Sequence, residues 1–285
     1  MKHILSAEDF SKEDIENVFA LARKKVWPRL AGKVMAALFY EPSTRTYGSF
    51  ISAMQRLGGG IIPLNGMTNT SVVKGETLRD TVVTFSKLSD IIVIRHPGPG
   101  ATHIASEASS VPVINAGDGI GEHPTQALLD LFTIQSHFHD ISEVTVTFVG
   151  DLKNGRTVHS LRSLLSLYHP KKIHLISPKE LAIPDTSGSD NLEKVLPETD
   201  VLYMTRVQKE RFSDPLSYER LKDSFRVTPA TMKKLKKTAI LMHPLPRVTE
   251  IEIDVDRDPR AVYFREQIQN GLYVRMALLS LILAT

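Results

Sequence analysis

The sequence predicts an α/β protein with two domains, each a parallel β-sheet flanked by helices. Short apolar runs typical of buried strands alternate with amphipathic segments typical of helices, and this cycle occurs twice along the chain. Polar residues collect where the predicted strands end, which is the edge at which parallel sheets carry their sites. The length of 285 residues leaves room for two domains of ordinary size.

The first half of the chain contains four predicted strands with helices between them. Ser11 and Asp14 have the spacing of a capping box, which predicts the start of a helix before the first strand. After that strand, Phe50, Ala53 and Met54 recur at the three- and four-residue spacing of one helix face. The predicted strands lie at residues 34–40, 61–64, 91–94 and 111–114.

The second half repeats the pattern and ends in a long helix at about residues 262–283. No spacer rich in Gly, Pro or Ser separates the halves, so we expect the helix after His123 to link them. We place the first domain at residues 1–127 and the second at residues 128–264. The four further strands lie at residues 144–149, 173–176, 201–204 and 239–242.

The composition excludes several classes of protein. A net charge of +3 gives no reason to expect nucleic-acid binding, and the chain has no cysteine for disulfides, thiolate nucleophiles or Cys-based metal sites. We therefore expect a cytoplasmic protein. The N-terminus lacks the apolar core of a signal peptide and the apolar run at 277–284 is too short for a bilayer, so we expect no membrane contact. No His, Asp and Glu cluster has metal-ligand spacing, and we expect neither a metal nor a cofactor.

The first predicted strand runs directly into a polar turn that can bind an anion. Ser43 is a suitable N-cap for the helix that follows, and Ser43, Thr44 and Thr46 can donate hydrogen bonds through their hydroxyl groups. Arg45 adds a guanidinium group, which pairs two oxygens at once. These residues predict a phosphate site, although an ordinary capped helix with a solvated arginine would have the same sequence. The turn reads Glu41-Pro42-Ser43-Thr44-Arg45-Thr46.

Several arginines stand at or just beyond the ends of predicted strands. Arginines at corresponding ends of parallel strands would converge on one anion-binding cleft, so the substrate should carry several negative charges. Lys74 lies in a polar segment, residues 66–75, that predicts an exposed loop. His123 begins a helix and is either a packed residue or a donor to a ligand carbonyl. The arginines are Arg45, Arg95, Arg156, Arg206 and Arg247.

Eight further segments, together with the turn, carry a family resemblance. In this order along the chain they resemble the motifs of the aspartate/ornithine carbamoyltransferase family, and most closely those of its aspartate-specific branch. They cover most of the chain. They are Ser71-Val72-Val73-Lys74-Gly75-Glu76-Thr77-Leu78, Arg95-His96-Pro97, Asn115-Ala116-Gly117-Asp118-Gly119, His123-Pro124-Thr125-Gln126, Val149-Gly150-Asp151-Leu152-Lys153, Gly155-Arg156-Thr157-Val158-His159-Ser160, Met204-Thr205-Arg206-Val207-Gln208-Lys209-Glu210-Arg211 and His243-Pro244-Leu245-Pro246-Arg247.

The resemblance implies a transferase that moves the carbamoyl group of carbamoyl phosphate to L-aspartate, a step of de novo pyrimidine biosynthesis. It assigns residues 1–127 to carbamoyl phosphate and residues 128–264 to aspartate, and it returns the C-terminal helix, 265–285, to the first domain. The implied catalytic residues are Arg45, Thr46, Arg95 and His123. The implied carbamoyl phosphate ligands are Ser43, Thr44, Arg45, Thr46, Arg95, His123, Gln126, Leu245 and Pro246.

The resemblance also implies how aspartate is bound and how the chain assembles. Lys74, Arg156, Arg206 and Gln208 would bind aspartate. Ser71 and Lys74 would reach into a neighbouring subunit's site, which implies a homotrimer with shared active sites. Regulatory or fused partner chains are compatible with the resemblance. In the family, the peptide bond that corresponds to Leu245–Pro246 is cis.

Two features depart from the family pattern. Tyr47 and Gly48 follow the turn where arginine or another residue is common, so the rim of the phosphate site can differ. The segment at 178–197 is shorter than usual, which suggests a lost edge strand in the second sheet or residues missing from the recorded sequence. Two alternatives remain, an ornithine-type carbamoyltransferase and a non-catalytic anion-binding homologue. Pro244 stands where ornithine-type enzymes carry a cysteine, which favours the aspartate reading.

Overall fold

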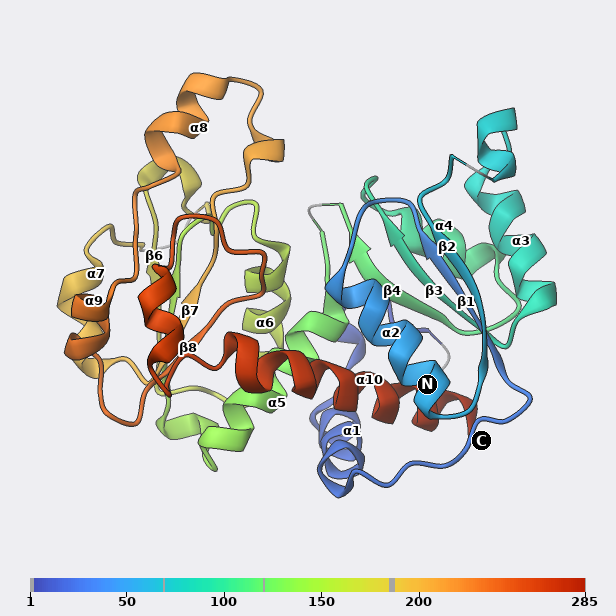
Figure 1. Ribbon diagram of the computed structural model, residues 1–285, viewed down its shortest axis with the longest axis horizontal. Coiled ribbons are helices and arrows are strands. Elements are labelled where there is room, and N and C mark those ends of the chain that lie inside the picture. Colours follow the sequence, from blue (N-terminus) through green and yellow to red (C-terminus); the bar gives the residue numbers. More distant parts are fainter. Residues whose placement is uncertain (1–2, 69, 120, 185–187, 285) are drawn as a thin grey trace. The chain divides into compact units, whose positions relative to one another are not determined.

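The computed structural model describes residues 3–68, 70–119, 121–184 and 188–284, which form two compact units (Figure 1). Unit 1 comprises Met1–Phe132 and Gln269–Thr285, and unit 2 comprises Thr133–Ile268. The first division falls within helix α5 (Pro124–His137) and the second at the start of helix α10 (Ile268–Leu283). Both lie a few residues beyond the boundaries that we placed at 127/128 and 264/265.

Unit 1 is built on a parallel four-stranded sheet with the order β2-β1-β3-β4. Ala37 at the centre of β1 is paired with Pro63 on β2 and Val93 on β3. The strands are almost entirely apolar, and β1 and β3 are buried along most of their length, as expected for a sheet covered on both faces. The strands β1 (Val34–Phe39), β2 (Gly60–Asn65) and β3 (Ile91–His96) lie at the predicted places. Strand β4 (Val113–Asp118) starts two residues later than the predicted strand at 111–114 and ends four residues beyond it.

The helices of unit 1 follow the strands as the sequence predicts. The capping box of α1 (Lys12–Lys24) is confirmed, because Ser11 Oγ accepts from Asp14 N while the Asp14 side chain accepts from Ser11 N. The N-cap predicted at Ser43 is wrong, because α2 starts one residue later with Thr44 as its N-cap. The predicted loop at 66–75 contains a short 3-10 helix, Ser71–Lys74. The remaining helices are α2 (Arg45–Arg56), α3 (Leu78–Leu88) and α4 (Ala101–Ala108).

Helix α10 joins unit 1 from the far end of the sequence. In Figure 1 its red ribbon runs beside α1 and α2, which come from the first sixty residues. Trp27, just beyond α1, stacks on Tyr273 with ring centres 5.7 Å apart, and Val274, Ala277 and Leu278 of α10 are buried. The predicted return of the C-terminal helix to the first domain is therefore confirmed.

Unit 2 has a second parallel sheet with the order β6-β5-β7-β8, the same arrangement as in unit 1. The strands are β5 (Thr145–Val149), β6 (Lys172–Ile176), β7 (Val201–Met204) and β8 (Ile240–Met242), again at the predicted places. The helices are α6 (Arg156–Ser166), α7 (Leu192–Val195), α8 (Pro215–Leu221) and α9 (Pro229–Lys234). A π-helix, Tyr263–Gln267, precedes α10.

The shortened segment after β6 leaves a trace of strand pairing at the edge of the sheet. Ser189 N donates to Leu175 O and Ser177 N donates to Ser189 O, both at 2.9 Å, so Ser189 forms a single parallel bridge with Ile176. Residues 185–187 of this segment lie outside the described part of the chain. Among the described residues, one bridge stands where a further strand would pair.

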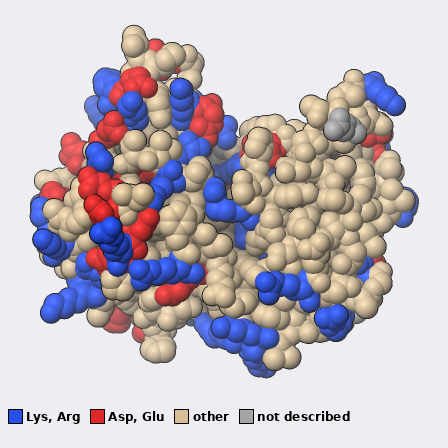
Figure 2. Space-filling model, in the orientation of Figure 1, with Lys and Arg blue, Asp and Glu red and all other residues tan. Residues whose placement is uncertain are grey.

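Two surface properties bear on possible partners. No helix in the described part of the chain is long and apolar enough to cross a membrane. On the face shown in Figure 2, Lys and Arg side chains of unit 2 are interspersed with Asp and Glu, and unit 1 carries scattered basic side chains.

Candidate functional site

Each unit has a topological switch point at the carboxyl edge of its sheet. After β1 the chain adds β2 on one side and later β3 on the other, so crossover connections leave the β1–β3 edge in opposite directions. The same occurs at β5 and β7 in unit 2. Ligands of open parallel sheets bind in the crevice at such points. Residues just after β1, β3, β5 and β7 are therefore the first candidates.

In unit 1 the end of β1 leads into the N-terminus of α2. Thr44 is the N-cap, but its side chain makes no capping hydrogen bond among the described residues. The positive end of the helix dipole and the hydroxyl groups of Ser43 and Thr44 border an open hollow of about 490 Å³. Pro42, Tyr47, Asn65 and Gly66 complete its lining. The hollow and the helix end together form a candidate anion site.

Thr46 and His123 bring a second group of donors to this region. Thr46 Oγ1, in the first turn of α2, lies 3.4 Å from His123 Nε2, just before α5. The two residues are 6% and 4% exposed, so the surroundings strengthen their interaction with a ligand. Gln126 is also buried, and its Nε2 donates to Asp130 Oδ1 at 3.0 Å. This hydrogen bond fixes the orientation of the Gln126 amide group and therefore of its carbonyl oxygen.

Arg95 at the end of β3 is aimed by the turn itself. Its Nη2 lies 2.6 Å from Glu41 Oε1, and its Nη1 donates to Ala116 O at 3.4 Å. Tyr40 N donates to Arg95 O at 2.8 Å, which ties the two strand ends together. The structure thus brings Arg95 to the same edge of the sheet as the turn, as the sequence predicts.

Arg275 of α10 is a buried residue that the sequence reasoning missed. It is 3% exposed, and its guanidinium group donates to Ser49 Oγ of α2 at 3.1 Å and to Thr125 Oγ1 of α5 at 3.4 Å. Its Cζ atom lies 5.2 Å from the centre of the Phe50 ring. Burial lowers the pKa of Arg275 to about 10, against an opposing effect of Asp130. The arginine connects the two helices whose first turns carry Thr46 and Gln126.

The switch point of unit 2 is organised by a buried carboxylate. Asp151 follows β5 and is fully buried, and its side chain accepts from the backbone N–H of Asn154 at 3.1 Å and of Gln208 at 3.4 Å. Gln208 Nε2 in turn donates to Asn154 O at 2.9 Å. Burial raises the pKa of Asp151, and these hydrogen bonds oppose that effect. The loops after β5 and β7 are therefore joined through one side chain.

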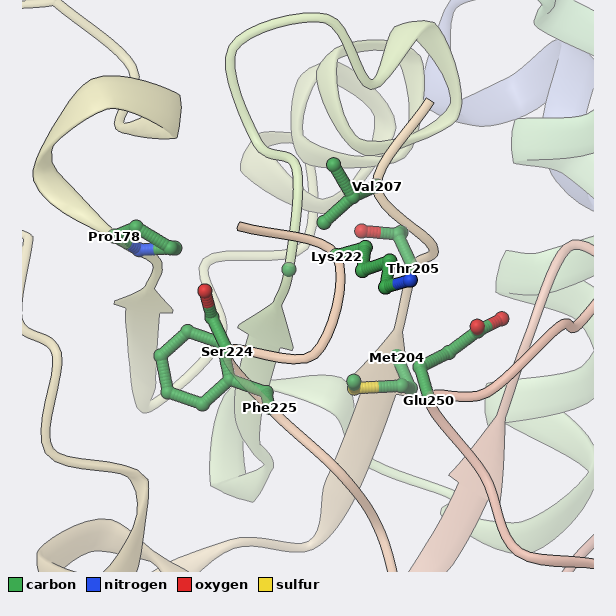
Figure 3. A pocket seen from close by; sticks show the side chains of 9 residues that line it. Pro178, Met204, Thr205, Val207, Lys222, Ser224, Phe225 and Glu250 are labelled. Carbon is green, nitrogen blue, oxygen red and sulfur yellow. The ribbon is translucent and has the colours of Figure 1, made fainter. Parts of the chain in front are cut away.

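The close approach of β5 and β7 depends on a glycine. Gly150 has φ +116°, and a Cβ atom there would lie 2.2 Å from Thr205 O. The small hollow beside these residues also involves Lys222 and Glu250, as Figure 3 shows, but it has no room for a water-sized guest. Ligand groups in unit 2 must therefore be bound by side chains beyond the hollow.

Three of the predicted arginines belong to unit 2, and they differ in their surroundings. Arg156 is the half-buried first residue of α6. Arg206 follows β7, and its Nη1 donates to Glu210 Oε2 at 3.1 Å. Arg247 donates from Nη2 to Asp256 Oδ2 at 2.6 Å and from Nη1 to Tyr263 OH at 3.1 Å. The hydrogen bond to Asp256 raises the pKa of Arg247. Arg247 therefore has a structural role, in which it binds Asp256 and Tyr263 of the same unit.

The loop after β8 contains the last predicted ligands. The Leu245–Pro246 peptide bond is cis, as the resemblance implies, and Leu245 has φ +55°. His243 and Glu250 enclose this loop as a buried pair, with His243 Nε2 2.8 Å from Glu250 Oε1. The proposed ligands Leu245 and Pro246 thus lie in a loop that the buried His243–Glu250 pair stabilises.

Two further predictions concern the surface and metals. Ser71 and Lys74 are exposed on their short helix in unit 1, next to Val73, which is 65% exposed. Among the residues that the structure describes, no group of three or more His, Asp or Glu side chains could hold a metal ion.

Comparisons with known families extend over both units. Residues 2–136 match the family described as "Aspartate/ornithine carbamoyltransferase, carbamoyl-P binding domain". Residues 142–282 match "Aspartate/ornithine carbamoyltransferase, Asp/Orn binding domain". These matches confirm the resemblance that the motifs indicated.

Curated relatives include free-standing and fused proteins. The aspartate carbamoyltransferase catalytic subunit of Thermococcus onnurineus is 48% identical over 303 residues, which cover 99% of this chain and 97% of that protein. The multifunctional protein CAD of Squalus acanthias is 49% identical over 302 residues, and there the chain spans only 13% of the relative's length. Both aligned lengths exceed 285 residues, as expected if this chain is shortened relative to them.

Solved structures give the same result. Aspartate transcarbamoylase from Trypanosoma cruzi in complex with carbamoyl phosphate has a TM-score of 0.92 and 40% identity, covering 99% of this chain and 96% of that one. The catalytic subunit of M. Jannaschii aspartate transcarbamoylase has a TM-score of 0.90 and 46% identity, covering 100% of this chain and 98% of that one.

Proposed function

The chain belongs to the aspartate/ornithine carbamoyltransferase family, and we propose that it transfers the carbamoyl group of carbamoyl phosphate to the amine of L-aspartate. The products are N-carbamoyl-L-aspartate, an intermediate of de novo pyrimidine biosynthesis, and phosphate. One observation carries the proposal. At the switch point of unit 1, the α2 N-terminus stands beside the Thr46–His123 pair and beside Arg95, which Glu41 orients.

Unit 1 supplies the groups that suit carbamoyl phosphate. The α2 N-terminus and its hydroxyl groups fit a phosphate, as does the guanidinium group of Arg45. In the proposal, Thr46, Arg95 and His123 donate to the carbonyl oxygen, and the contacts of Thr46 with His123 and of Arg95 with Glu41 support this assignment. The remaining ligands in the proposal are Ser43 and Thr44 for the phosphate, and Gln126 with Leu245 and Pro246 for the carbamoyl NH2 group.

Unit 2 supplies the groups that suit the two carboxylates of aspartate. Arg156 and Arg206 each present a guanidinium group, which binds a carboxylate through two parallel hydrogen bonds. Gln208 is held beside them through Asp151 and Asn154. Lys74, on the exposed short helix of unit 1, is the fourth aspartate ligand in the proposal.

The proposed chemistry needs no covalent intermediate. The aspartate amine attacks the carbonyl carbon, a tetrahedral intermediate forms, and phosphate leaves as the carbonyl is restored. Negative charge develops on the carbonyl oxygen during the attack, and donors fixed around that oxygen lower the barrier most. Holding both substrates in position supplies much of the remaining rate enhancement.

We also propose a homotrimer in which Ser71 and Lys74 enter a neighbouring subunit's site. The exposure of both residues and of Val73 beside them supports a segment that another copy covers. Regulatory or fused partner chains fit the multifunctional relatives, of which this chain would form a small part. A cytoplasmic location suits a chain without cysteine.

A turnover assay tests the proposal directly. Incubation with carbamoyl phosphate and L-aspartate should release phosphate and form N-carbamoyl-L-aspartate, and L-ornithine in place of aspartate should give no product. Turnover with ornithine alone would establish the ornithine-type alternative. Binding of carbamoyl phosphate without phosphate release at any aspartate concentration would establish the non-catalytic alternative.

A subunit-mixing assay tests the shared site. Arg45→Ala and Lys74→Ala variants, each inactive alone, should regain part of the activity when they are dissociated and mixed. In a mixed trimer, some sites receive both wild-type residues. If mixing restores nothing while mixed trimers form, the proposal that Lys74 acts in a neighbouring subunit is wrong.

A further inference from the structure

The loop after β8 contains a buried histidine for which the proposed function has no direct role. We infer that His243, as the neutral ring protonated at Nε2, is a positioning residue that fixes Leu245 and thereby aims the Leu245 carbonyl oxygen. The ring is 2% exposed and lies two residues before Leu245. This inference rests on the proposed function for what the Leu245 carbonyl binds, whereas the protonation state follows from the loop itself.

The hydrogen bond at Nδ1 determines which nitrogen carries the proton. Leu245 N lies 2.7 Å from His243 Nδ1, and a backbone N–H can only donate. His243 Nδ1 must therefore accept, so it has no proton. In a neutral ring the proton is then on Nε2, which lies 2.8 Å from Glu250 Oε1 and donates to it.

Glu250 gives the ring a fixed point in unit 2. Its carboxylate is 3% exposed and accepts from Val248 N and Thr249 N, both at 3.1 Å, as well as from the ring. Its backbone oxygen accepts from Val227 N at 2.8 Å, which anchors it to a neighbouring segment. Burial alone would raise the pKa of Glu250, but its interactions with His243 and with backbone N–H groups together outweigh that effect and lower the pKa. The partner of the ring is therefore an immobile carboxylate.

The backbone of Leu245 needs such support. Its φ of +55° lies in the left-handed region, which is unfavourable for a residue other than glycine and persists only where the surroundings impose it. The bond from Leu245 N to the ring fixes the peptide before Leu245, and the φ and ψ angles of Leu245 then set the direction of its carbonyl group. Glu250, His243 and Leu245 thus form one chain of contacts that ends at a proposed ligand atom.

Nitrogen NMR on the unaltered chain tests the protonation state. Protein labelled with ¹⁵N at His and Leu should show a coupling across the hydrogen bond from the Leu245 amide to His243 Nδ1. The proton of the same ring should be attached to Nε2. A proton on Nδ1, in a neutral or a charged ring, would overturn the inference whether or not the variants below fold.

Two substitutions separate the two nitrogens of the ring. In His243→Asn the amide oxygen stands near the position of Nδ1 and can still accept from Leu245 N. In His243→Gln the amide nitrogen stands near the position of Nε2 and can still donate to Glu250. We expect kcat to fall by less than about threefold in His243→Asn and by about 100-fold in His243→Gln, the size of effect that a 1 Å misplacement produces.

Stability should change in the opposite order, which distinguishes positioning from a structural role. His243→Asn leaves the buried Glu250 carboxylate without one donor, and hydrogen bonds to charged groups contribute more than those between neutral groups. His243→Asn should therefore melt at the lower temperature and yet retain the higher kcat. If kcat follows melting temperature across the pair, or if both variants turn over equally, His243 does not aim Leu245.

A second histidine provides the matched control. His174 on β6 also faces a glutamate, with Nε2 2.7 Å from Glu198 Oε1, but it is not part of the loop after β8. His174→Asn and His174→Gln should have equal kcat values within about twofold. If the wild-type chain forms no product at all, the proposed function fails, while the NMR result still decides the protonation state of His243.

Discussion

The two units share one topology but prepare their switch points for anions in different ways. In unit 1 the helix after β1 starts with Thr44, whose side chain makes no capping bond in the described structure, so the helix end faces an open hollow. In unit 2 the loop after β5 contains Asp151, and its carboxylate occupies backbone N–H groups of Asn154 and Gln208. The same strand order therefore presents an open helix end in one unit and a buried carboxylate that joins two loops in the other.

The difference follows from the placement of one buried carboxylate. Gly155, the N-cap of α6, likewise makes no side-chain capping hydrogen bond in the described structure, so the units differ in the groups around the helix end and not in its capping. Asp151 fixes the loop that precedes Arg156 and the loop that carries Arg206 and Gln208. We propose that Arg156 and Arg206 bind a dicarboxylate, because a guanidinium group can pair both oxygens of a flat carboxylate.

The largest effect is expected from Arg45→Ala in unit 1. We expect kcat to fall by about 10²–10³-fold, the usual cost of one donor to developing charge, with little change in stability because the side chain is exposed. Steady-state kinetics and a thermal melt measure both quantities. Arg56→Ala, at the exposed end of the same helix, is the control and should be fully active. Normal turnover in Arg45→Ala would remove the phosphate assignment.

Arg206→Ala should affect the other substrate. The loss of a charge-assisted hydrogen bond of about 1.5–3 kcal/mol corresponds to a rise in the aspartate KM of roughly 10- to 150-fold. The KM for carbamoyl phosphate should stay within about twofold, because unit 1 is unaltered. Arg226→Ala removes an exposed arginine of unit 2 and serves as the control. An equal rise in both KM values would contradict the division of labour between the units.

Asp151→Asn tests the carboxylate that distinguishes the units. We expect a roughly tenfold rise in the aspartate KM and a loss of about 1–3 kcal/mol in the free energy of unfolding at pH 7, because a buried acceptor is weakened. Burial raises the pKa of Asp151 above 3.8, so the folded chain keeps this proton to a higher pH than the unfolded chain.

The sign of the pH effect follows from that shift. Between the unfolded and the folded pKa the native state binds more protons, so the contribution of Asp151 to stability falls as pH rises from about 4. The difference in unfolding free energy between wild type and Asp151→Asn, measured with urea at several pH values, should decrease over this range. A difference that grows with pH would show that the hydrogen bonds outweigh burial.

The smallest effect is expected from Ser49→Ala in unit 1. The substitution removes one of the two side-chain hydroxyl partners of Arg275, and a hydrogen bond of this kind contributes about 0.5–1.5 kcal/mol. We expect that loss in the free energy of unfolding with kcat within about twofold. Ser52→Ala, whose hydroxyl accepts from the exposed Arg56, should cost less. A large drop in kcat would mean that the hydrogen bond from Arg275 to Ser49 is needed to position α2, and that the remaining bond to Thr125 is not sufficient.

The sequence predicts the strands and the local motifs of both units well. Apolar runs predict seven of the eight strands closely, because buried parallel strands have few polar positions. Strand β4 extends four residues beyond the predicted run, because Asn115 and Asp118 are polar but buried. The Ser11–Asp14 capping box also depends only on neighbouring residues. The N-cap at Ser43 was predicted one residue too early, because either of the adjacent hydroxyl residues Ser43 and Thr44 can stand at a helix start.

Contacts between distant segments could not be predicted in the same way. Arg275 lies 226 residues from Ser49, and nothing in the apolar pattern of α10 marks it as a ligand of α2. Asp151 and Gln208 are 57 residues apart, and only the β5–β7 pairing brings them together. The motifs identify the candidate site residues, but the hydrogen bonds that hold these residues in position form only in the tertiary structure.

The return of α10 to unit 1 has a consequence for how the protein is made. Unit 2 is continuous in sequence, from Thr133 to Ile268, whereas unit 1 combines the residues that precede this stretch with the residues that follow it. On the ribosome, the second half of the chain can therefore complete its folding before the first half, which waits for its last helix. We expect nascent chains halted before α10 to hold unit 2 in a protease-resistant form while the earlier-born sheet is still digested.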